Sequence, residues 1–252
     1  MSTFTKDKLK VSVYDNRRDM GIAAAEKGIC FLKELLKSKE EVNVIFAAAP
    51  SQAEMMERLV SEKSVDWSRV NAFHMDNYIG LPDDAPQQFS KFLKDRLFSK
   101  LPFQNIYYMG NVGEDAKRYD ILISENPPDI CFMGIGENGH IAFNDPINAE
   151  FNDEKAVKVV ELDDMCRQQQ VNEKLFNTID EVPTHAITLT IPTLIKSKYI
   201  LCTVPGLNKA EATKNMLEGD IDESCPASIL RTHSSAYLFL DKDAASKLSE
   251  VK

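Results

Sequence analysis

The most informative stretch of the sequence is residues 130–146, which reads Ile-Cys-Phe-Met-Gly-Ile-Gly-Glu-Asn-Gly-His-Ile-Ala-Phe-Asn-Asp-Pro. The run Ile130 to Met133 is continuously apolar, which is typical of a strand covered on both faces. The glycines that follow match the dinucleotide-binding pattern G-x-G-x-x-G, but that pattern must open a helix that carries the pyrophosphate. Pro146 forbids a long helix here, so we reject a dinucleotide site. The loop instead indicates a tightly turned backbone that presents the imidazole of His140.

Similar apolar runs recur along the chain and alternate with helical patterns. The predicted strands are 9–13, 42–47, 70–74, 130–133, 187–191, 199–204 and 236–240. The spacing of apolar residues predicts helices over 19–39, 51–64, 89–97 and 208–218, and Ser51 with Glu54 matches a capping box. This alternation predicts an α/β fold: one domain over residues 1–252 with a single doubly wound, mainly parallel, Rossmann-like sheet flanked by helices.

Composition and charge argue against several classes of protein. The chain has 252 residues, 43% of them hydrophobic, and a net charge of −9. We expect no nucleic-acid partner, because no cluster of Lys and Arg interleaves with aromatic residues. The five cysteines lack a C-x-x-C pair and the histidines lack H-x-x-x-H spacing, so we expect neither disulfides nor a metal site. A polar N-terminus and the absence of any long apolar run predict a cytoplasmic protein without a membrane span.

Chemically rich loops follow four of the predicted strands, at the edge where such sheets bind ligands. These loops are Ala48 to Gln52, Met75 to Tyr78, Gly134 to Pro146 and Pro205 to Lys209. Histidine titrates near neutrality, so His140 together with the carboxylates of Asp76 and Asp145 makes a candidate acid/base group. Simpler interpretations stay open at this point, namely a structural histidine, an Asp-Pro turn and a helix cap.

Two segments carry a family resemblance. Phe73 to Pro82 reads Phe-His-Met-Asp-Asn-Tyr-Ile-Gly-Leu-Pro and resembles the F-N-M-D-E-Y-x-G-L segment of glucosamine-6-phosphate deaminases. Gly134 to Pro146 resembles the G-x-G-x-D-G-H-I-A-F-N-E-P segment of the same family, and the likeness runs from about Lys8 to Leu248. The related 6-phosphogluconolactonases carry G-H-T-A-S-L-F-P at this place. The Phe-Asn pair therefore favours the deaminase/isomerase branch.

The resemblance implies that an amino-sugar 6-phosphate, of glucosamine or galactosamine, is converted to a ketose 6-phosphate and ammonia. It implies no cofactor, because the carbonyl of the opened sugar acidifies the C2 proton. Asp76 matches the general base, His140 the histidine that assists ring opening, and Lys209 a lysine that grips the phosphate. The other implied contacts with substrate and phosphate are Ala49, Ser51, Gln52, Gly136 and Gly139. Family members range from monomer to hexamer, so a homo-oligomer is one expectation.

Several positions depart from the family pattern. Asn138 stands where the family has an aspartate that orients the histidine, and Asp145 stands where it has a glutamate. A run of alanines, Ala47 to Ala49, replaces a glycine-rich phosphate loop. These changes weaken the usual carboxylate–imidazole relay and predict a divergent subfamily. A lactone hydrolase and a non-catalytic sugar-phosphate sensor stay as alternatives, and Arg167 and Lys174 are weaker candidates for substrate contact.

Overall fold

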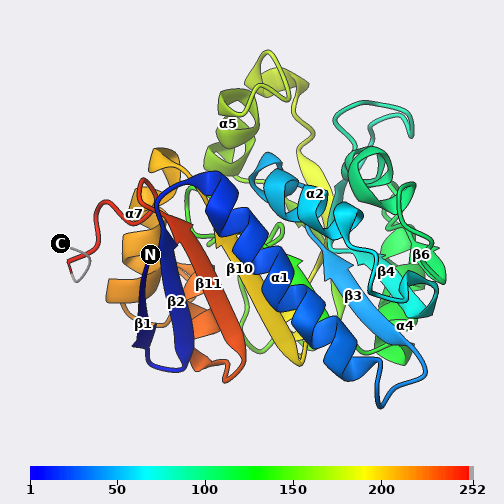
Figure 1. The fold of residues 1–252 in the computed structure, drawn as a ribbon. Helices are drawn as coiled ribbons and strands as arrows, with labels where there is room; N and C mark the ends of the chain where they lie inside the picture. The colour runs from blue at the N-terminus through cyan, green and yellow to red at the C-terminus, as the bar shows by residue number, and fades with distance from the viewer. Residues whose placement is uncertain (250–252) are drawn as a thin grey trace.

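The computed structural model describes residues 1–249, so the last three residues of the predicted 1–252 domain lie outside the described part. The strands of the main sheet are β1 (Ser2–Lys6), β2 (Leu9–Tyr14), β3 (Val42–Phe46), β4 (Val70–His74), β6 (Asn105–Tyr107), β7 (Ile130–Met133), β10 (Tyr199–Val204) and β11 (Ala236–Asp241). They lie in the order β1-β2-β11-β10-β7-β3-β4-β6 (Figure 1). In this part of the chain all neighbouring pairs are parallel except β1–β2. The predicted mainly parallel α/β sheet is confirmed.

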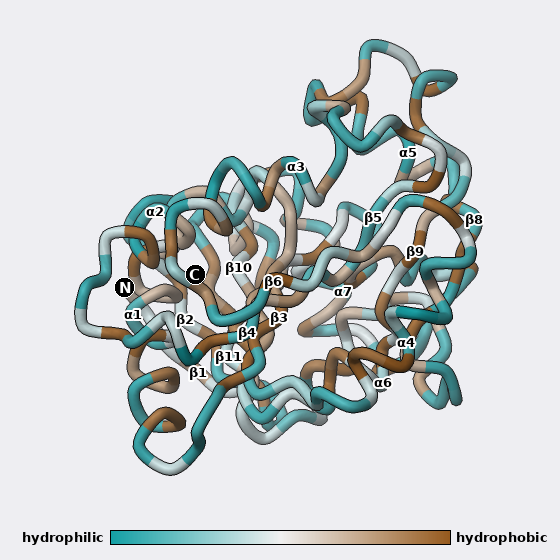
Figure 2. The backbone as a smooth tube through the Cα atoms, turned by 90° about the vertical axis from the view of Figure 1, so that its right-hand side faces the viewer, coloured by the Kyte–Doolittle hydropathy of each residue, from teal (hydrophilic) through white to brown (hydrophobic). Residues whose placement is uncertain are grey.

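Helices cover both faces of this sheet. On one face lie α1 (Arg17–Leu35) and α2 (Ala53–Ser61), and on the other lie α4 (Asp115–Glu125), α6 (Ile191–Ile195) and α7 (Ala210–Glu218) (Figures 1 and 2). Gly28 brings α1 close to the sheet, because a Cβ there would stand 2.3 Å from the ring of Phe132 in β7. Among residues 1–249, no helix combines the length and hydrophobicity that a membrane span needs.

A second, smaller sheet corrects one predicted strand. It is antiparallel, with β5 (Asp76–Tyr78), β9 (His185–Leu189) and β8 (Val157–Glu161) in the order β5-β9-β8. The strand predicted at 187–191 is β9, so it lies in this sheet and not in the parallel one. It also ends earlier than predicted, because Pro192 sits in the first turn of α6, where proline is well tolerated.

The predicted capping box at Ser51 and Glu54 is wrong. A 3-10 turn, Pro50–Gln52, precedes α2, and no side chain of the described chain caps that helix. Glu54 instead accepts a hydrogen bond of 2.6 Å from Nε of Arg17, which ties α2 to α1. Ser51 accepts one of 3.1 Å from the amide of Gln52. Ser51 therefore stabilises the loop after β3, and Glu54 stabilises the contact between α1 and α2.

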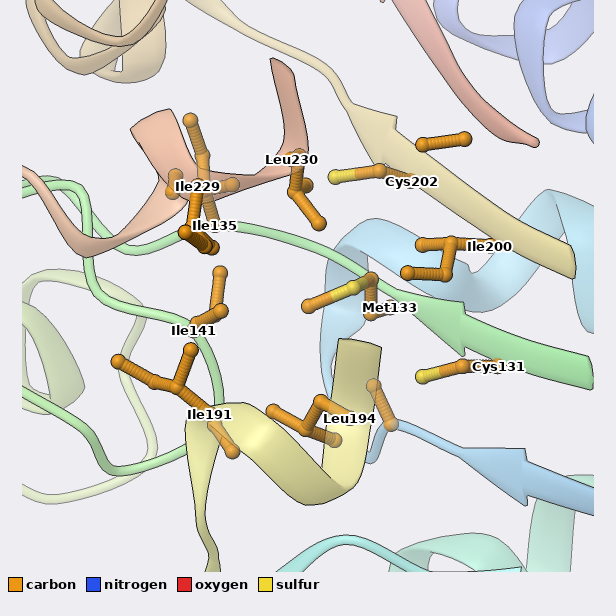
Figure 3. Packing of buried hydrophobic residues seen from close by; sticks show 14 of the residues in the cluster. Cys131, Met133, Ile135, Ile141, Ile191, Leu194, Ile200, Cys202, Ile229 and Leu230 are labelled. Atoms are coloured by element: carbon orange, nitrogen blue, oxygen red, sulfur yellow. The ribbon is translucent and has the colours of Figure 1, made fainter. Parts of the chain in front are cut away.

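The glycine-rich loop after β7 is anchored in the core. Its two isoleucines, Ile135 and Ile141, are buried beside Ile229 and Leu230, with Met133 of β7 nearby (Figure 3). As predicted from Pro146, the segment 134–146 forms no helix. The apolar anchors hold both ends of the turn, so the polar residues between them have a defined direction.

The remaining helices lie beside the loops. α3 (Phe89–Leu93) continues into a π-helical turn, Lys94–Phe98, and α5 (Asp164–Asn172) follows β8. α5 and its connecting loops project from the body of the molecule (Figures 1 and 2). Side chains from this projecting segment reach the site described next.

Candidate active site

Four neighbouring parallel strands, β10, β7, β3 and β4, end at one edge of the sheet, and the loops after them surround one cavity of about 70 Å³. The residues that these loops bring to the cavity include Ala49, Ser51, Asp76, Gly134, His140 and Lys209. Parallel strands place their carboxyl ends together, which is why loops distant in the sequence meet here. Pairing of β5 with β9 fixes the backbone of Asp76, opposite Thr188.

Asp76 brings a buried carboxyl group to the cavity. Its Oδ1 has no hydrogen-bond partner among the described residues, and the residue is only 6% exposed. Burial raises the pKa of Asp76 to about 8, because desolvation disfavours the charged form. A carboxyl group with a pKa near neutrality can both accept and return a proton.

His140 and Asp145 form a close pair. Nδ1 of the imidazole lies 2.8 Å from Oδ1 of the carboxylate, and the Asp145 side chain is fully buried. Burial would raise the pKa of Asp145, but the neighbouring His140, Asn138 and Cys166 outweigh it and lower the pKa. Asp145 is therefore a carboxylate at neutral pH, and it faces Nδ1 of the imidazole. Asp145 itself stands behind His140, outside the cavity lining.

Asn138 joins two carboxylates. Its Nδ2 lies 3.0 Å from Oδ1 of Asp145 and 3.3 Å from Oδ2 of Asp163, and donates to both. Its Oδ1 accepts a hydrogen bond of 3.1 Å from the backbone N–H of His140. An aspartate at this position would add a third negative charge beside the other two. The asparagine therefore orients the histidine loop without that repulsion.

The glycines of the loop make room and turn the chain. A Cβ at Gly136 would stand 2.2 to 2.5 Å from atoms of the His140 ring, so the imidazole lies directly over this residue. Gly139 has a φ of 84°, in the left-handed region that glycine tolerates. Neither residue lines the cavity, whereas Gly134 does. The structure thus places Gly136 and Gly139, which we predicted as substrate contacts, where they position the imidazole.

Lys209 is the cation of the cavity. It is 5% exposed. The loop before it is held in place by Gly206, which donates its backbone N–H to the Asp241 carboxylate. Burial lowers the pKa of Lys209, and the carboxylates of Glu173 and Glu137 oppose that shift. Nζ lies 3.7 Å from Oε1 of Glu173, which comes from the segment just after α5. The predicted phosphate lysine thus faces the cavity with a carboxylate beside it.

The residues of the loop after β3 lie at different positions relative to the cavity. Ala49 and Ser51 line the cavity, as a phosphate site requires. Gln52 is fully buried, and its amide donates to Oγ of Ser51 and to the carbonyl of Met133 at 3.2 Å. The Gln52 amide is therefore engaged within the protein and holds Ser51 in place.

A family model described as glucosamine-6-phosphate isomerases/6-phosphogluconolactonase matches residues 15–239. The chain belongs to this family. A member from Bacillus cereus (strain B4264), named glucosamine-6-phosphate deaminase, is 36% identical over 231 residues, which cover 90% of this chain and 86% of the relative. The protein of that name from Bacillus thuringiensis (strain Al Hakam) gives the same identity and coverage.

Solved structures of the glucosamine-6-phosphate isomerase/6-phosphogluconolactonase family share the fold. A monomeric glucosamine-6-phosphate deaminase superposes with a TM-score of 0.85 at 29% identity, covering 94% of this chain and 98% of that one. The 6-phosphogluconolactonase from Thermotoga maritima gives a TM-score of 0.76 at 20% identity, covering 93% and 100%. The similarity to this lactonase shows that the two proteins share a fold.

Sequence analysis of this family member missed the contribution of the α5 segment. Gln169, Gln170, Glu173 and Leu175 line the cavity. The run of three glutamines from Gln168 to Gln170, in a segment without a predicted element, was the available signal. Arg167 donates to the carbonyls of Ile179 and Val182, which is a structural role, and Lys174 is exposed with a φ of 61°. Neither of these weaker candidates lines the cavity.

One group of possible metal ligands was not visible in the sequence. His140, Asp145 and Cys166 come from two segments, and a ligand atom from each lies within 4.8 Å of the others. Their separation along the chain matches no spacing pattern for metal sites. The predicted absence of a metal site stays a prediction, and this cluster bears directly on it.

Proposed function

We propose that the chain is an amino-sugar 6-phosphate deaminase that gives a ketose 6-phosphate and ammonia, with glucosamine 6-phosphate as the first substrate to test. The observation that carries the proposal is the buried carboxyl group of Asp76 in one cavity with His140. Two groups of different acidity allow two different proton transfers. The curated relatives with this activity in their names support it.

The reaction begins with opening of the sugar ring. His140, stabilised by Asp145, moves the proton between the C1 hydroxyl and the ring oxygen, which leaves an aldehyde at C1. Asp76 then removes the proton from C2 and returns it to C1, while O1 gains the proton that the amino group loses. The aldehyde at C1 thereby becomes an alcohol, and an imine forms at C2. Water adds to that carbon and ammonia leaves, which completes the ketose.

The phosphate end of the substrate lies at Lys209 and Ser51 in this proposal. Lys209 supplies a charge, and the loop of Ala49 to Ser51 supplies backbone N–H groups before a helix, where anions bind well. Glucosamine and galactosamine phosphates differ only at C4, and both belong to the substrate class that we propose. The predicted cytoplasmic location is part of the same proposal.

An ammonia-coupled assay with both amino-sugar phosphates tests the proposal. We expect ammonia release from at least one of them, and exchange of the C2 proton with deuterium of the solvent. The profile of kcat/KM should rise with pH on a limb well above the usual aspartate pKa of 3.8, towards about 8, because Asp76 must lose its proton.

The lactonase and sensor alternatives make different predictions. Hydrolysis of 6-phosphogluconolactone, run in parallel, needs no C2 proton transfer and would be insensitive to Asp76→Asn. Turnover of the lactone without ammonia release from any amino sugar would overturn the proposal. Tight binding of a sugar phosphate without C2 proton exchange would also overturn the proposal and would support the sensor.

A further inference from the structure

A cysteine lies next to the pair that we assign to ring opening. Sγ of Cys166, a ring nitrogen of His140 and a carboxylate oxygen of Asp145 are mutually within 4.8 Å, and all three residues are buried. We propose that these three side chains bind a zinc-like divalent cation, which inhibits the enzyme reversibly. The inhibition rests on the proposed role of His140, since a metal-bound imidazole cannot move a proton.

The donor set fits zinc. Imidazole nitrogen, thiolate sulfur and carboxylate oxygen are the usual ligands of Zn²⁺ in proteins, and three of them with one open position make a common open site. Bonds of about 2.0 to 2.3 Å place tetrahedral ligands roughly 3.3 to 3.8 Å apart. Nδ1 and Oδ1 lie 2.8 Å apart, closer than that range, and one ligand atom from each of the three residues lies within 4.8 Å of the others. A small side-chain adjustment therefore completes the site.

Two buried atoms in the cluster lack hydrogen bonds. Within residues 1–249, neither Nδ1 of His140 nor Oδ2 of Asp145 has a hydrogen-bond partner. Nδ1 lies 2.8 Å from Oδ1 of Asp145, and that oxygen already accepts a hydrogen bond from Asn138. Buried polar atoms in proteins are nearly always paired. A cation between Nδ1 and Oδ2 would satisfy both atoms at once.

Surrounding residues hold the ligands in place. Asn138 donates to Oδ1 of Asp145, which fixes the carboxylate and leaves Oδ2 available. Asp163 caps α5 by accepting a hydrogen bond of 2.6 Å from the backbone N–H of Cys166, which fixes that residue in the first turn. Burial and the carboxylates of Asp145, Asp163 and Asp76 raise the pKa of the thiol. The thiol is therefore protonated without a metal, and the cation must displace that proton.

His140 is shared by the cation site and the substrate cavity. It lines the cavity, as do Gln169 and Gln170, which follow Cys166 on α5. Substrate and cation would therefore compete for the imidazole. This arrangement predicts that a saturating sugar phosphate slows inhibition by Zn²⁺.

Titration of the full-length protein with Co²⁺, a spectroscopic substitute for zinc, tests the site directly. We expect one equivalent to bind with a thiolate-to-cobalt charge-transfer band. Cys166→Ser should abolish the band and weaken binding by at least the roughly 10- to 100-fold that losing an outer-shell partner costs. Zn²⁺ should no longer inhibit its ammonia release, measured against the variant's own rate in metal-free buffer. Cys30→Ser, which removes an exposed thiol on α1, is the matched control and should keep both band and inhibition.

Absence of the band in the unsubstituted protein would overturn the proposal without any variant having to fold. Equal cobalt affinity of the protein and Cys166→Ser would overturn it too. If the protein binds cobalt but keeps full activity in the presence of Zn²⁺, the proposed inhibition is wrong. Because the cobalt spectrum needs no substrate, a failure of the deaminase assay and a failure of the metal site are distinguishable.

Discussion

Two carboxylates of the site differ in pKa because their neighbours differ. Asp76 is buried and its Oδ1 has no hydrogen-bond partner among residues 1–249, whereas Asp145 lies against His140 and accepts from Asn138. Burial therefore dominates at the first and raises its pKa, while the neighbours outweigh burial at the second and lower its pKa. Asp76 can therefore act as a base that titrates near neutral pH, whereas Asp145 stays a carboxylate.

Asp76→Asn should abolish ammonia release and make the fold more stable at alkaline pH. The folded pKa of about 8 exceeds the ordinary 3.8, so the folded state binds more protons and stability is lost as pH rises between these values. The amide removes that cost, which is on the order of a few kcal/mol. Urea unfolding at pH 5 and pH 9, beside the ammonia assay, measures both effects.

Asp145→Asn is the matched comparison and should behave oppositely. Its lowered pKa contributes stability above the ordinary value of 3.8, and that contribution is lost as pH falls through the folded pKa. The amide should therefore reduce stability at neutral pH and reduce turnover. Equal shifts of the two variants at pH 9 would contradict the assigned difference.

Gly136→Ala should reduce turnover nearly as much as loss of His140 itself. The added Cβ would overlap the imidazole, at 2.2 Å from its nearest atom, and the ring must leave its place beside Asp145. Gly113→Ala is the control, since a Cβ there meets no described atom within 4 Å. Ammonia release at saturating substrate measures the change. Full activity of Gly136→Ala would show that the ring position is unimportant.

At the scale of elements, the α5 segment connects the glycine loop with the phosphate end of the cavity. Gln169 accepts from the backbone N–H of Glu137 at 2.9 Å and donates to Glu173 at 2.8 Å, and Glu173 lies beside Lys209. The cavity is far smaller than the roughly 300 to 1,000 Å³ of small-molecule sites. Residues of the α5 segment form part of its wall.

Glu173→Gln should lower KM for the sugar phosphate, because the substrate phosphate then has no carboxylate to displace from Lys209. We expect about a fivefold effect, equivalent to about 1 kcal/mol, with kcat little changed. Steady-state kinetics on the amino-sugar phosphate measure it. An increase in KM would mean that Glu173 supports the lysine and does not compete with the phosphate.

Asn138 connects the glycine loop with the start of α5, because it donates to both Asp145 and Asp163. Asn138→Asp restores the family residue but places a third carboxylate beside Asp145 and Asp163. We expect a loss of about 1 to 3 kcal/mol in unfolding free energy and no gain in activity. Asp163→Asn in the same chain should recover most of that loss, since asparagine also caps helices well. Additive losses in the double variant would exclude this coupling.

At the scale of the whole molecule, the parallel sheet is a common scaffold and the loops carry the chemistry. The Thermotoga maritima lactonase shares this fold at 20% identity. Strands β10, β7, β3 and β4 bring four loops to one edge in both the predicted and the observed arrangement. The small sheet adds what the scaffold lacks, because β5 holds Asp76 in register with β9.

The sequence by itself determined the parallel sheet, the loops that meet at its edge, and the presentation of His140, because apolar runs, periodicity and Pro146 act locally. It also indicated Asp76, Ser51 and Lys209 as members of one site. Only the tertiary structure decided that the segment at 187–191 joins a separate sheet, that Cys166 and Glu173 reach the site, and that Gly136 makes room for a ring. The physical reason is that burial, pKa and contact depend on residues distant along the chain, and no local pattern records which of them meet.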